Sequence, residues 1–242
     1  MHVVLTGATG SIGTEVLRQC LKTPTITHIT VLGRRVPSSF PASPQLEFIT
    51  HTDFLTYPPP LLDALRAKDC KACIWCLGVH TTQVRDRTEY ELITRDYALA
   101  AAKAFKSLCP NFRFIYTSIL AADAGAWDMV REVHGETERE LLGLEGVDVF
   151  CVRPGAVEAA KKEGAGWWER FGVVVTFLFR VVPSLHIYGD VLATGFVRIA
   201  VEGMEGVKSV LGEEKRVIPS KEMKLLGAVD SGRDNKVNKV SG

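Results

Sequence analysis

Three glycines near the start of the chain are spaced for binding an anion. Residues 1–13 read MHVVLTGATGSIG, so a short apolar run is followed by Gly7, Gly10 and Gly13. Glycine permits a tight turn, lets the backbone approach a bound group, and lets a helix pack closely against a strand. The unpaired amides at the start of such a helix, aided by its dipole, attract an anion. The pattern predicts a turn that binds the pyrophosphate of a dinucleotide, and a turn needed only for packing is the alternative.

Two arginines follow the second apolar run. Arg34 lies 21 residues after Gly13 and is followed by Arg35, with no acidic residue beside them. Near this position an acidic residue holds the ribose hydroxyls of NAD, whereas arginine accepts the 2′-phosphate of NADP. A planar guanidinium suits bidentate phosphate recognition. We therefore expect NADP(H) as the cofactor, and two solvated surface charges are the alternative.

The elements that must position these residues alternate between strand and helix. Apolar runs predict strands over residues 3–6, 28–32, 46–50, 72–77, 112–117 and 147–152. Helical spacing or proline at a first turn predicts helices over residues 12–22, 58–67, about 89–108 and 127–142. Six strands separated by helices predict an α/β fold with a doubly wound, mainly parallel sheet of the Rossmann-like kind.

The domain organisation follows from where this alternation weakens. With 242 residues, 46% of them hydrophobic, the chain can fill one α/β domain with a small C-terminal lobe. We expect an NAD(P)-binding core over residues 1–155 and a small substrate- or partner-side lobe over residues 156–227. Residues 228–242 hold too few apolar side chains to fold alone, so we expect a disordered tail.

The charge balance bears on partners and location. The chain has 29 basic and 28 acidic residues and a formal net charge of +1, so no global field attracts nucleic acid. Partners are then expected to be a small-molecule cofactor and a protein. The first residues form the first predicted strand without a basic region or a cleavage site. We therefore expect an intracellular, cytoplasmic protein.

Three cysteines have a spacing that invites a metal interpretation. Cys70, Cys73 and Cys76 are three residues apart. Because side chains alternate along a strand, Cys73 and Cys76 should point to opposite faces of the sheet and cannot share a metal. We expect no metal site and assign these cysteines to the apolar core.

Five motifs together resemble a known superfamily. They are Thr6 to Gly13 (TGATGSIG), Gly33-Arg34-Arg35, Asp53-Phe54, Cys76-Leu77-Gly78 and Arg153-Pro154-Gly155, each at the end of a predicted strand. They resemble the atypical short-chain dehydrogenase/reductases, and most of all the branch that includes the Tat-interacting, NADPH-binding proteins. The resemblance covers about residues 1–203 and is most specific in the first 80.

The resemblance implies positions around the cofactor. Asp53 and Phe54 would flank the adenine, Leu77 and Gly78 would lie along the cofactor, and Ser118 would sit beside the nicotinamide. Two alternatives remain, because Asp53 is also suited to capping a turn and Ser118 to capping the end of its strand. The residues expected to bind the cofactor are Gly7, Thr9, Gly10, Ser11, Ile12, Gly13, Arg34, Arg35, Asp53, Phe54, Leu77, Gly78 and Ser118.

The catalytic pair of this superfamily is missing from the sequence. It is Tyr-x-x-x-Lys on the helix after the fifth strand, where the tyrosine exchanges a proton with the substrate and the lysine lowers its pKa. No tyrosine in this chain is followed four residues later by lysine. Matching the helix through residues 134–138 places Val130 and His134 at the two positions, facing the nicotinamide. His134 has a side chain suited to acid/base work, but a packed histidine is the alternative, so the catalytic residues are unknown.

A second unusual segment covers residues 167–182 and begins with Trp167 and Trp168. Its uncharged run is too short to span a bilayer. It suits a lobe over the cofactor cleft, a protein contact or a membrane interface.

Three functional hypotheses remain. The first is an NADP(H)-binding, oxidoreductase-like protein that does not use the Tyr/Lys pair. The second is a catalytically silent NADP(H)-binding regulator or scaffold, and the third is a peripheral membrane protein that uses residues 167–182.

Overall fold

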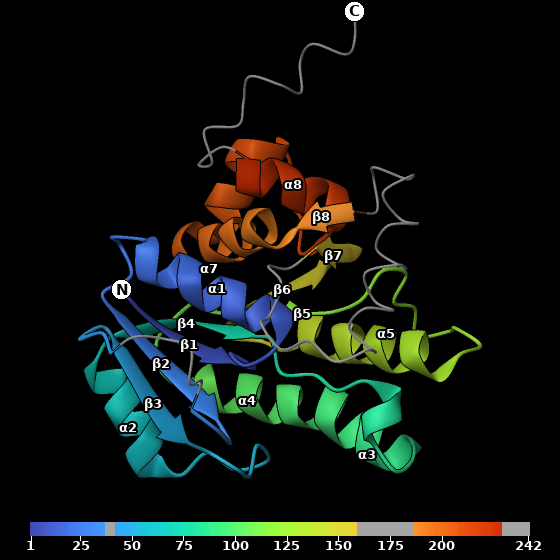
Figure 1. Cartoon of the computed structure of the whole chain (residues 1–242), viewed down its shortest axis with the longest axis horizontal. Coiled ribbons are helices and arrows are strands. Elements are labelled where there is room, and N and C mark those ends of the chain that lie inside the picture. Colours follow the sequence, from blue (N-terminus) through green and yellow to red (C-terminus); the bar gives the residue numbers. More distant parts are fainter. Residues whose placement is uncertain (37–41, 159–185, 229–242) are drawn as a thin grey trace, which may run out of the picture.

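A single parallel sheet forms the centre of the molecule. The computed structural model describes residues 1–36, 42–158 and 186–228. The sheet has seven strands in the order β3-β2-β1-β4-β5-β6-β9, and every neighbouring pair is parallel (Figure 1). Its strands are β1 (His2–Thr6), β2 (His28–Gly33), β3 (Leu46–Thr50), β4 (Cys70–Trp75), β5 (Phe112–Thr117), β6 (Val147–Arg153) and β9 (Val217–Pro219). The α/β, Rossmann-like prediction is confirmed.

Helices cover both faces of this sheet (Figure 1). One face carries α1 (Ser11–Lys22), α7 (Gly189–Leu211) and α8 (Ser220–Ala228). The other carries α2 (Pro59–Ala67), α4 (Tyr97–Phe105) and α5 (Met129–Leu142). A short 3-10 helix, η1 (Thr81–Gln83), and helix α3 (Arg87–Glu91) precede α4. The sheet is therefore buried on both sides, as parallel sheets usually are.

The strands divide the core into two apolar clusters. Leu5 and Ile74 belong to the cluster beneath α1 and α7, whereas Val4 and Trp75 belong to the cluster beneath α2 and α4. All four side chains are fully buried. Because successive strand residues face opposite sides, each central strand contributes to both clusters.

The cysteines follow the same alternation. Cys73 packs in the cluster beneath α4, and Cys76 packs against the opposite cluster, so the two thiols lie on different faces as the sequence predicted. Cys70 lies on the side of Cys73, because a register irregularity between β1 and β4 shifts the strand at this point. All six cysteines are unpaired.

The helix predicted over residues 89–108 is not continuous. A π-helical turn, η2 (Leu92–Asp96), separates α3 from α4. A π turn inserts one residue into the helical repeat, so the side chains that follow are rotated about the axis. The apolar period of the sequence did not reveal this insertion.

The chain after Gly155 contributes more structure than the sequence indicated. Strands β7 (Ala156–Glu158) and β8 (His186–Tyr188) form a small parallel pair, and β9 pairs with β6 as a seventh strand of the main sheet, where six were predicted. Ala228, assigned to the tail by the sequence, is the last residue of α8. Residues 167–182 and 229–242 lie outside the described residues.

Helix α7 bends at a glycine. Gly203 has φ +63° and ψ −142°, and the guanidinium of Arg113 on β5 caps the broken turn. Arg113 Nη1 donates to the carbonyl oxygens of Ala200 and Val201, each at 3.0 Å. The first part of α7 is thereby anchored to the sheet.

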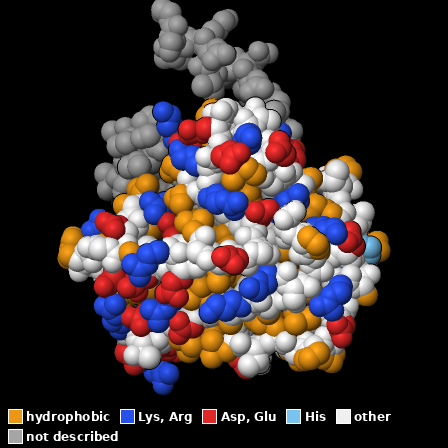
Figure 2. Space-filling view, turned by 180° about the vertical axis from the view of Figure 1, so that it is seen from behind, with side chains coloured by type: hydrophobic (Ala, Val, Ile, Leu, Met, Phe, Trp, Pro, Cys, Tyr) orange, Lys and Arg blue, Asp and Glu red, His pale blue; other side chains and the backbone are white. Residues whose placement is uncertain are grey.

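The surface carries no large region of a single charge on the side shown in Figure 2, where basic, acidic and hydrophobic side chains are interspersed. Among the described residues, no helix combines the length and the apolar character needed to cross a membrane.

Candidate functional site

The turn after β1 requires glycine at two of its three positions. Gly7 has φ +67°, and a Cβ there would lie 2.2 Å from the carbonyl oxygen of Cys76. A Cβ on Gly13 would lie 2.1 Å from the carbonyl oxygen of Gly7. Both distances are far shorter than a van der Waals contact. Gly7 therefore lets the turn approach the chain that follows β4, and Gly13 lets α1 approach the turn.

Gly10 plays a different part in this turn. It is the N-cap of α1 with φ −76°, and as a glycine it has no side chain with which to cap the first turn of the helix. A Cβ on Gly10 would meet only the carbonyl oxygen of Gly7, at 3.3 Å. Thr9, Gly10 and Ser11 are exposed, and the first turn carries no acidic residue. The helix start is thus an open, uncapped end that suits the pyrophosphate of a dinucleotide.

This turn lies where the order of the sheet reverses. The strand after β1 in the chain, β2, lies on one side of β1, and β4 lies on the other. Ligands of open parallel sheets bind at such a point, outside the carboxyl ends of the strands. Leu77 follows β4 there, and its amide donates to Thr6 Oγ1 at 3.3 Å. Gly78 beside it is exposed.

Arg34 and Arg35 directly follow β2, at the same edge of the sheet as the glycine turn. Both side chains are exposed, and within residues 1–36, 42–158 and 186–228 neither takes part in an ion pair. The two guanidinium groups at this edge can donate hydrogen bonds to a phosphate.

The structure gives Asp53 and Phe54 local roles. Asp53 Oδ2 accepts from Thr56 Oγ1 at 2.7 Å and Oδ1 accepts from the amide of Leu55 at 3.0 Å. These bonds, the one from Thr56 first, lower the pKa of Asp53. Phe54 is 2% exposed and packs edge-on against Trp75. Asp53 thus caps a turn, and the buried side chain of Phe54 belongs to the core.

Ser118 carries a hydroxyl without a partner. Its backbone amide donates to the carbonyl oxygen of Val152 at 2.7 Å, so the amide, and not the hydroxyl, ties the end of β5 to β6. Ser118 Oγ is buried and finds no hydrogen bond among the described residues. A buried hydroxyl without a partner costs about 1–3 kcal/mol, so a ligand that bonds to it is favoured.

Val130 and His134, the two positions that the sequence comparison assigned to the catalytic pair, both lie on α5. Val130 is half-buried one helical turn before His134. His134 Nδ1 lies 2.9 Å from the hydroxyl of Tyr116 on β5, so the ring is directed at the sheet. Burial lowers the pKa of His134 to about 4. The imidazole is therefore neutral near pH 7 and does not supply the positive charge of a lysine.

One ion pair at the site had no sequence signal. Arg153 ends β6, and its Nε lies 2.9 Å from Glu138 Oε1 on α5. Arg153 Nη2 lies 2.5 Å from Glu138 Oε2, and Glu138 is 3% exposed. The Arg-Pro-Gly motif therefore fixes the end of β6 to α5, and its arginine is not free to bind a ligand.

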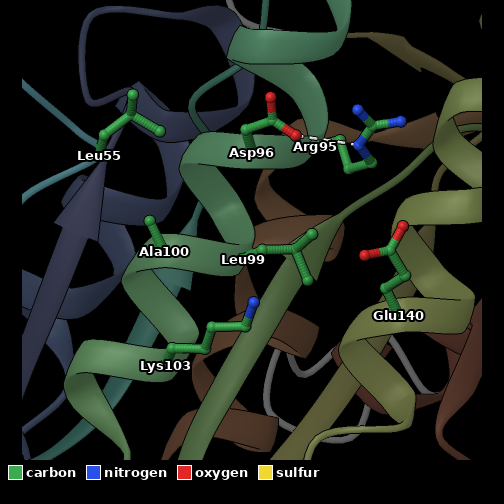
Figure 3. Close-up of a pocket in the computed structure, with 7 residues that line it drawn as sticks. All are labelled: Leu55, Arg95, Asp96, Leu99, Ala100, Lys103 and Glu140. Carbon is green, nitrogen blue, oxygen red and sulfur yellow. Dashed lines mark hydrogen bonds and ion pairs between the residues drawn. The ribbon is translucent and has the colours of Figure 1, made fainter.

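A separate groove opens on the outer side of α4 and α5 (Figure 3). It has a volume of about 590 Å³ and is lined by Leu55, Arg95, Asp96, Leu99, Ala100, Lys103 and Glu140. None of these residues belongs to the predicted cofactor set. In the described part of the chain, no three His, Cys, Asp or Glu side chains are placed to hold a metal ion.

No protein-family model matches the sequence. The leucinostatins biosynthesis cluster protein T of Purpureocillium lilacinum is 28% identical over 190 residues, which cover 69% of this chain and 69% of that protein. Protein FMP52, mitochondrial, of Candida albicans is 23% identical over 168 residues, which cover 69% of this chain and 71% of that protein. Neither name states an activity.

Solved structures show the fold more clearly. Gre2 of Candida albicans in complex with NADPH superposes with a TM-score of 0.66 at 12% identity, over 90% of this chain and 77% of that one. WbmF of Bordetella bronchiseptica in complex with NADH gives 0.64 at 12% identity, over 92% and 74%. The chain therefore shares the Rossmann-like α/β fold of these nucleotide-bound enzymes, as the alternation of strands and helices in its sequence indicated.

Proposed function

We propose that this protein binds NADP(H) and belongs, by its chemistry, to the oxidoreductase-like proteins that do not use a Tyr/Lys pair. One observation carries the proposal: the uncapped start of α1, held by Gly7 and Gly13 at the point where the strand order reverses. Such an end offers backbone amides and a favourable dipole to a pyrophosphate. The cofactor-bound Gre2 and WbmF structures support a nicotinamide nucleotide as the ligand.

The preference for NADP(H) rests on Arg34 and Arg35. Both are exposed at the carboxyl end of β2, and the neighbouring positions Gly33 and Val36 carry no acid. A 2′-phosphate would make charge-assisted hydrogen bonds with these side chains. Ser118 would contribute its unpartnered hydroxyl beside the nicotinamide.

The residues at positions 130 and 134 limit which groups can supply the proton for a reduction. Bound NADPH would supply a hydride, and reduction of a carbonyl group also needs a proton donor. Val130 has no ionisable group, and His134 holds its Nδ1 against Tyr116. A proton for the reaction must therefore come from another group, and Ser118 Oγ, one residue past the end of β5, is the candidate.

The test compares cofactor binding in the unmodified chain and in Gly10→Val. Calorimetry should show stoichiometric NADPH binding in the first and none in the second, because a valine side chain occupies the place of the pyrophosphate. Binding that survives the substitution, with an unchanged melting curve, would show that the turn serves packing only.

A second candidate function is a silent NADP(H)-binding regulator. The neutral, hydrogen-bonded His134 favours it, because the position that should assist catalysis is occupied by a group engaged with the core. In this case cofactor binding would stabilise the fold, and a partner would recognise the bound state. Stoichiometric binding without turnover over a broad carbonyl panel distinguishes it from the first.

Location and membrane contact remain proposals. We retain a cytoplasmic location, and the name of the FMP52 relative makes the mitochondrion the alternative to test by fractionation. A membrane role would depend on residues 167–182, outside the described residues. Co-sedimentation with liposomes, lost on deleting Trp167 and Trp168, would support that role.

A further inference from the structure

The loop between β5 and α5, residues 118–128, carries the most exposed large hydrophobic side chain in the described part of the chain. Trp127 is 91% exposed, whereas the next such side chain, Val36, is 61% exposed. Leu120, in the same loop, is 39% exposed. The loop follows β5 at the carboxyl edge of the sheet, the edge that carries the glycine turn. Exposed tryptophan is typical of protein interfaces and of the boundary between a membrane and water.

The loop is held in one conformation, so the position of Trp127 is fixed. The amide of Asp123 donates to the carbonyl oxygen of Arg131 on α5 at 3.0 Å. The loop backbone also lies directly on α5, because a Cβ on Gly135 would lie 2.2 Å from the amide nitrogen of Ala124. The loop is therefore ordered before any partner binds, and little conformational entropy is lost on binding.

A guanidinium group lies beside the exposed indole. Arg131 Cζ is 5.9 Å from the centre of the Trp127 ring, and Arg131 Nε donates to Asp128 Oδ2. The two Nη groups of Arg131 form no hydrogen bond with a described residue, and this side chain is 35% exposed. Their N–H groups are available to a phosphate oxygen directly beside an apolar side chain.

The small apolar area of the loop favours a lipid surface over a protein partner. A stable protein interface buries about 800 Å² on each partner around a packed centre. In this loop the large exposed apolar side chains are those of Trp127 and Leu120. Neither the groove beside α4 nor the smaller groove at the starts of β2 and β3 is lined by a residue of the loop. A bilayer needs no complementary pocket, because an indole lies at the depth of the headgroups and a guanidinium reaches their phosphates.

The charges of the loop favour a zwitterionic lipid. Asp128 is paired with Arg131, and hydrogen bonds from the Arg131 amide and side chain lower the pKa of Asp128. Asp123 is a further carboxylate, and its Oδ1 accepts from the amide of Gly125 at 3.0 Å. The loop therefore has no excess of positive charge with which to attract anionic lipids. Binding through it must come from apolar contact and from the bond between a guanidinium and a phosphate.

We propose that Trp127, Leu120 and Arg131 dock this protein on the surface of a bilayer of zwitterionic phospholipid, such as phosphatidylcholine. The indole and the leucine side chain enter the boundary of the acyl chains, and Arg131 donates to a headgroup phosphate. The carboxyl edge of the sheet, with its glycine turn, is then held toward the lipid. Unlike the membrane contact considered above for residues 167–182, this docking uses only described residues, and it does not depend on cofactor binding.

Sedimentation of the full chain with phosphatidylcholine vesicles tests the docking. Trp127→Ala should lower the partition coefficient about 10-fold or more, because the apolar area of the indole is withdrawn from the lipid. Leu225→Ala, at an exposed leucine on α8, is the matched control and should leave binding unchanged. Raising the salt concentration, or adding phosphatidylserine to the vesicles, should not strengthen binding. Both variants should keep the melting temperature of the unmodified chain, because both side chains are exposed.

Fluorescence quenching identifies which tryptophan meets the lipid. Brominated phosphatidylcholine should quench part of the tryptophan fluorescence, and Trp127→Phe should abolish that quenching. Replacing Trp167 and Trp168 by phenylalanine should retain it. If the unmodified chain does not bind phosphatidylcholine vesicles, or binds only anionic ones, the proposal is wrong, and Trp127 is left to a protein partner. Binding that survives Trp127→Ala and disappears when Trp167 and Trp168 are replaced also overturns it.

Discussion

The carbonyl oxygen of Gly7 faces Gly13 so closely that a Cβ on Gly13 would lie 2.1 Å from it. Gly10, between them in the chain, has no comparable restriction, because a Cβ there would lie 3.3 Å from the carbonyl oxygen of Gly7 and its φ is negative. The three glycines therefore separate into two that the fold requires and one that faces outward.

This difference predicts two outcomes for one kind of substitution. Gly13→Ala should lower the melting temperature strongly, because the helix must move away from the turn. Gly10→Val should leave the melting temperature within a few degrees of the unmodified chain and abolish NADPH binding. Thermal unfolding and calorimetry on both variants check this. Equal destabilisation of the two variants would contradict the assignment of Gly10 to the ligand.

The exposed arginines after β2 predict a cofactor preference. NADPH should bind more tightly than NADH, and replacing Arg34 and Arg35 by alanine should remove most of the difference. A charge-assisted contact contributes on the order of 1.5–3 kcal/mol, which corresponds to roughly tenfold or more in Kd. Arg139→Ala, an exposed arginine on α5, is the control. Equal affinities for the two cofactors in the unmodified chain would refute the preference.

Positions 130 and 134 predict an absence of the usual turnover. Reduction of ketones, aldehydes and quinones by NADPH through the usual phenol-assisted mechanism should be undetectable, because general acid catalysis by a phenol typically contributes about 10²- to 10⁴-fold. Val130→Tyr combined with His134→Lys should restore weak turnover if the pocket admits a substrate. Rapid turnover that survives both His134→Ala and Ser118→Ala would place the proton donor elsewhere, in the chain after Gly155.

The kink in α7 predicts that alanine substitutions at two glycines lower the stability of the protein by different amounts. Gly203→Ala places a Cβ 2.6 Å from Arg113 Nε at φ +63° and should lower the free energy of unfolding by about 1–3 kcal/mol. Gly212 has φ +75° with open space around it, so Gly212→Ala should cost only about 1 kcal/mol of backbone strain. Urea unfolding measures both. A larger loss of unfolding free energy in Gly212→Ala than in Gly203→Ala would show that the Arg113 side chain moves aside without cost.

Buried histidines predict weaker folding in acid. Burial lowers the pKa of His2 to about 4, below its ordinary value of 6.5. Between these two pKa values His2 is protonated in the unfolded chain and neutral in the folded chain. Its contribution to the free energy of unfolding is therefore constant above pH 6.5 and falls between about pH 6.5 and 4. His134 acts in the same direction. His2→Phe should reduce the loss of stability between pH 7 and 5 in urea titrations, and an unchanged slope would argue against a buried, neutral His2.

Much of the sheet was predictable because its strands are short apolar runs between helices. The first glycine turn was also predictable, because its residues lie within a short stretch of the sequence and two of its glycines, Gly7 and Gly13, are required sterically. Helix α7 was missed, since Gly195, Gly203 and Gly206 interrupt its apolar pattern. Gly195 serves packing instead, because a Cβ there would lie 2.7 Å from Met223 on α8, whereas Gly203 permits the bend of α7. Strand β9 has only three residues and gave no periodic signal.

The site was less predictable, because it depends on contacts between distant residues. The ion pair between Arg153 and Glu138 joins residues on different elements, and neither their residue types nor their spacing in the sequence predicts it. The bond from His134 to Tyr116 depends on how α5 lies over β5. The alternative role of Asp53 as a turn cap is confirmed, and its position beside the adenine stays a prediction.

The helix that presents the glycine turn, α1, packs against α7, which begins more than 160 residues later in the chain. Its buried residues Val16, Leu17 and Cys20 share a core cluster with Phe196 and Ile199. During synthesis these apolar side chains of α1 stay exposed until α7 has been made. In a fragment ending at residue 155 they would remain exposed to water. We therefore expect such a fragment to aggregate or recruit a chaperone, so that the ability to bind a nucleotide is acquired only when nearly the whole chain has emerged.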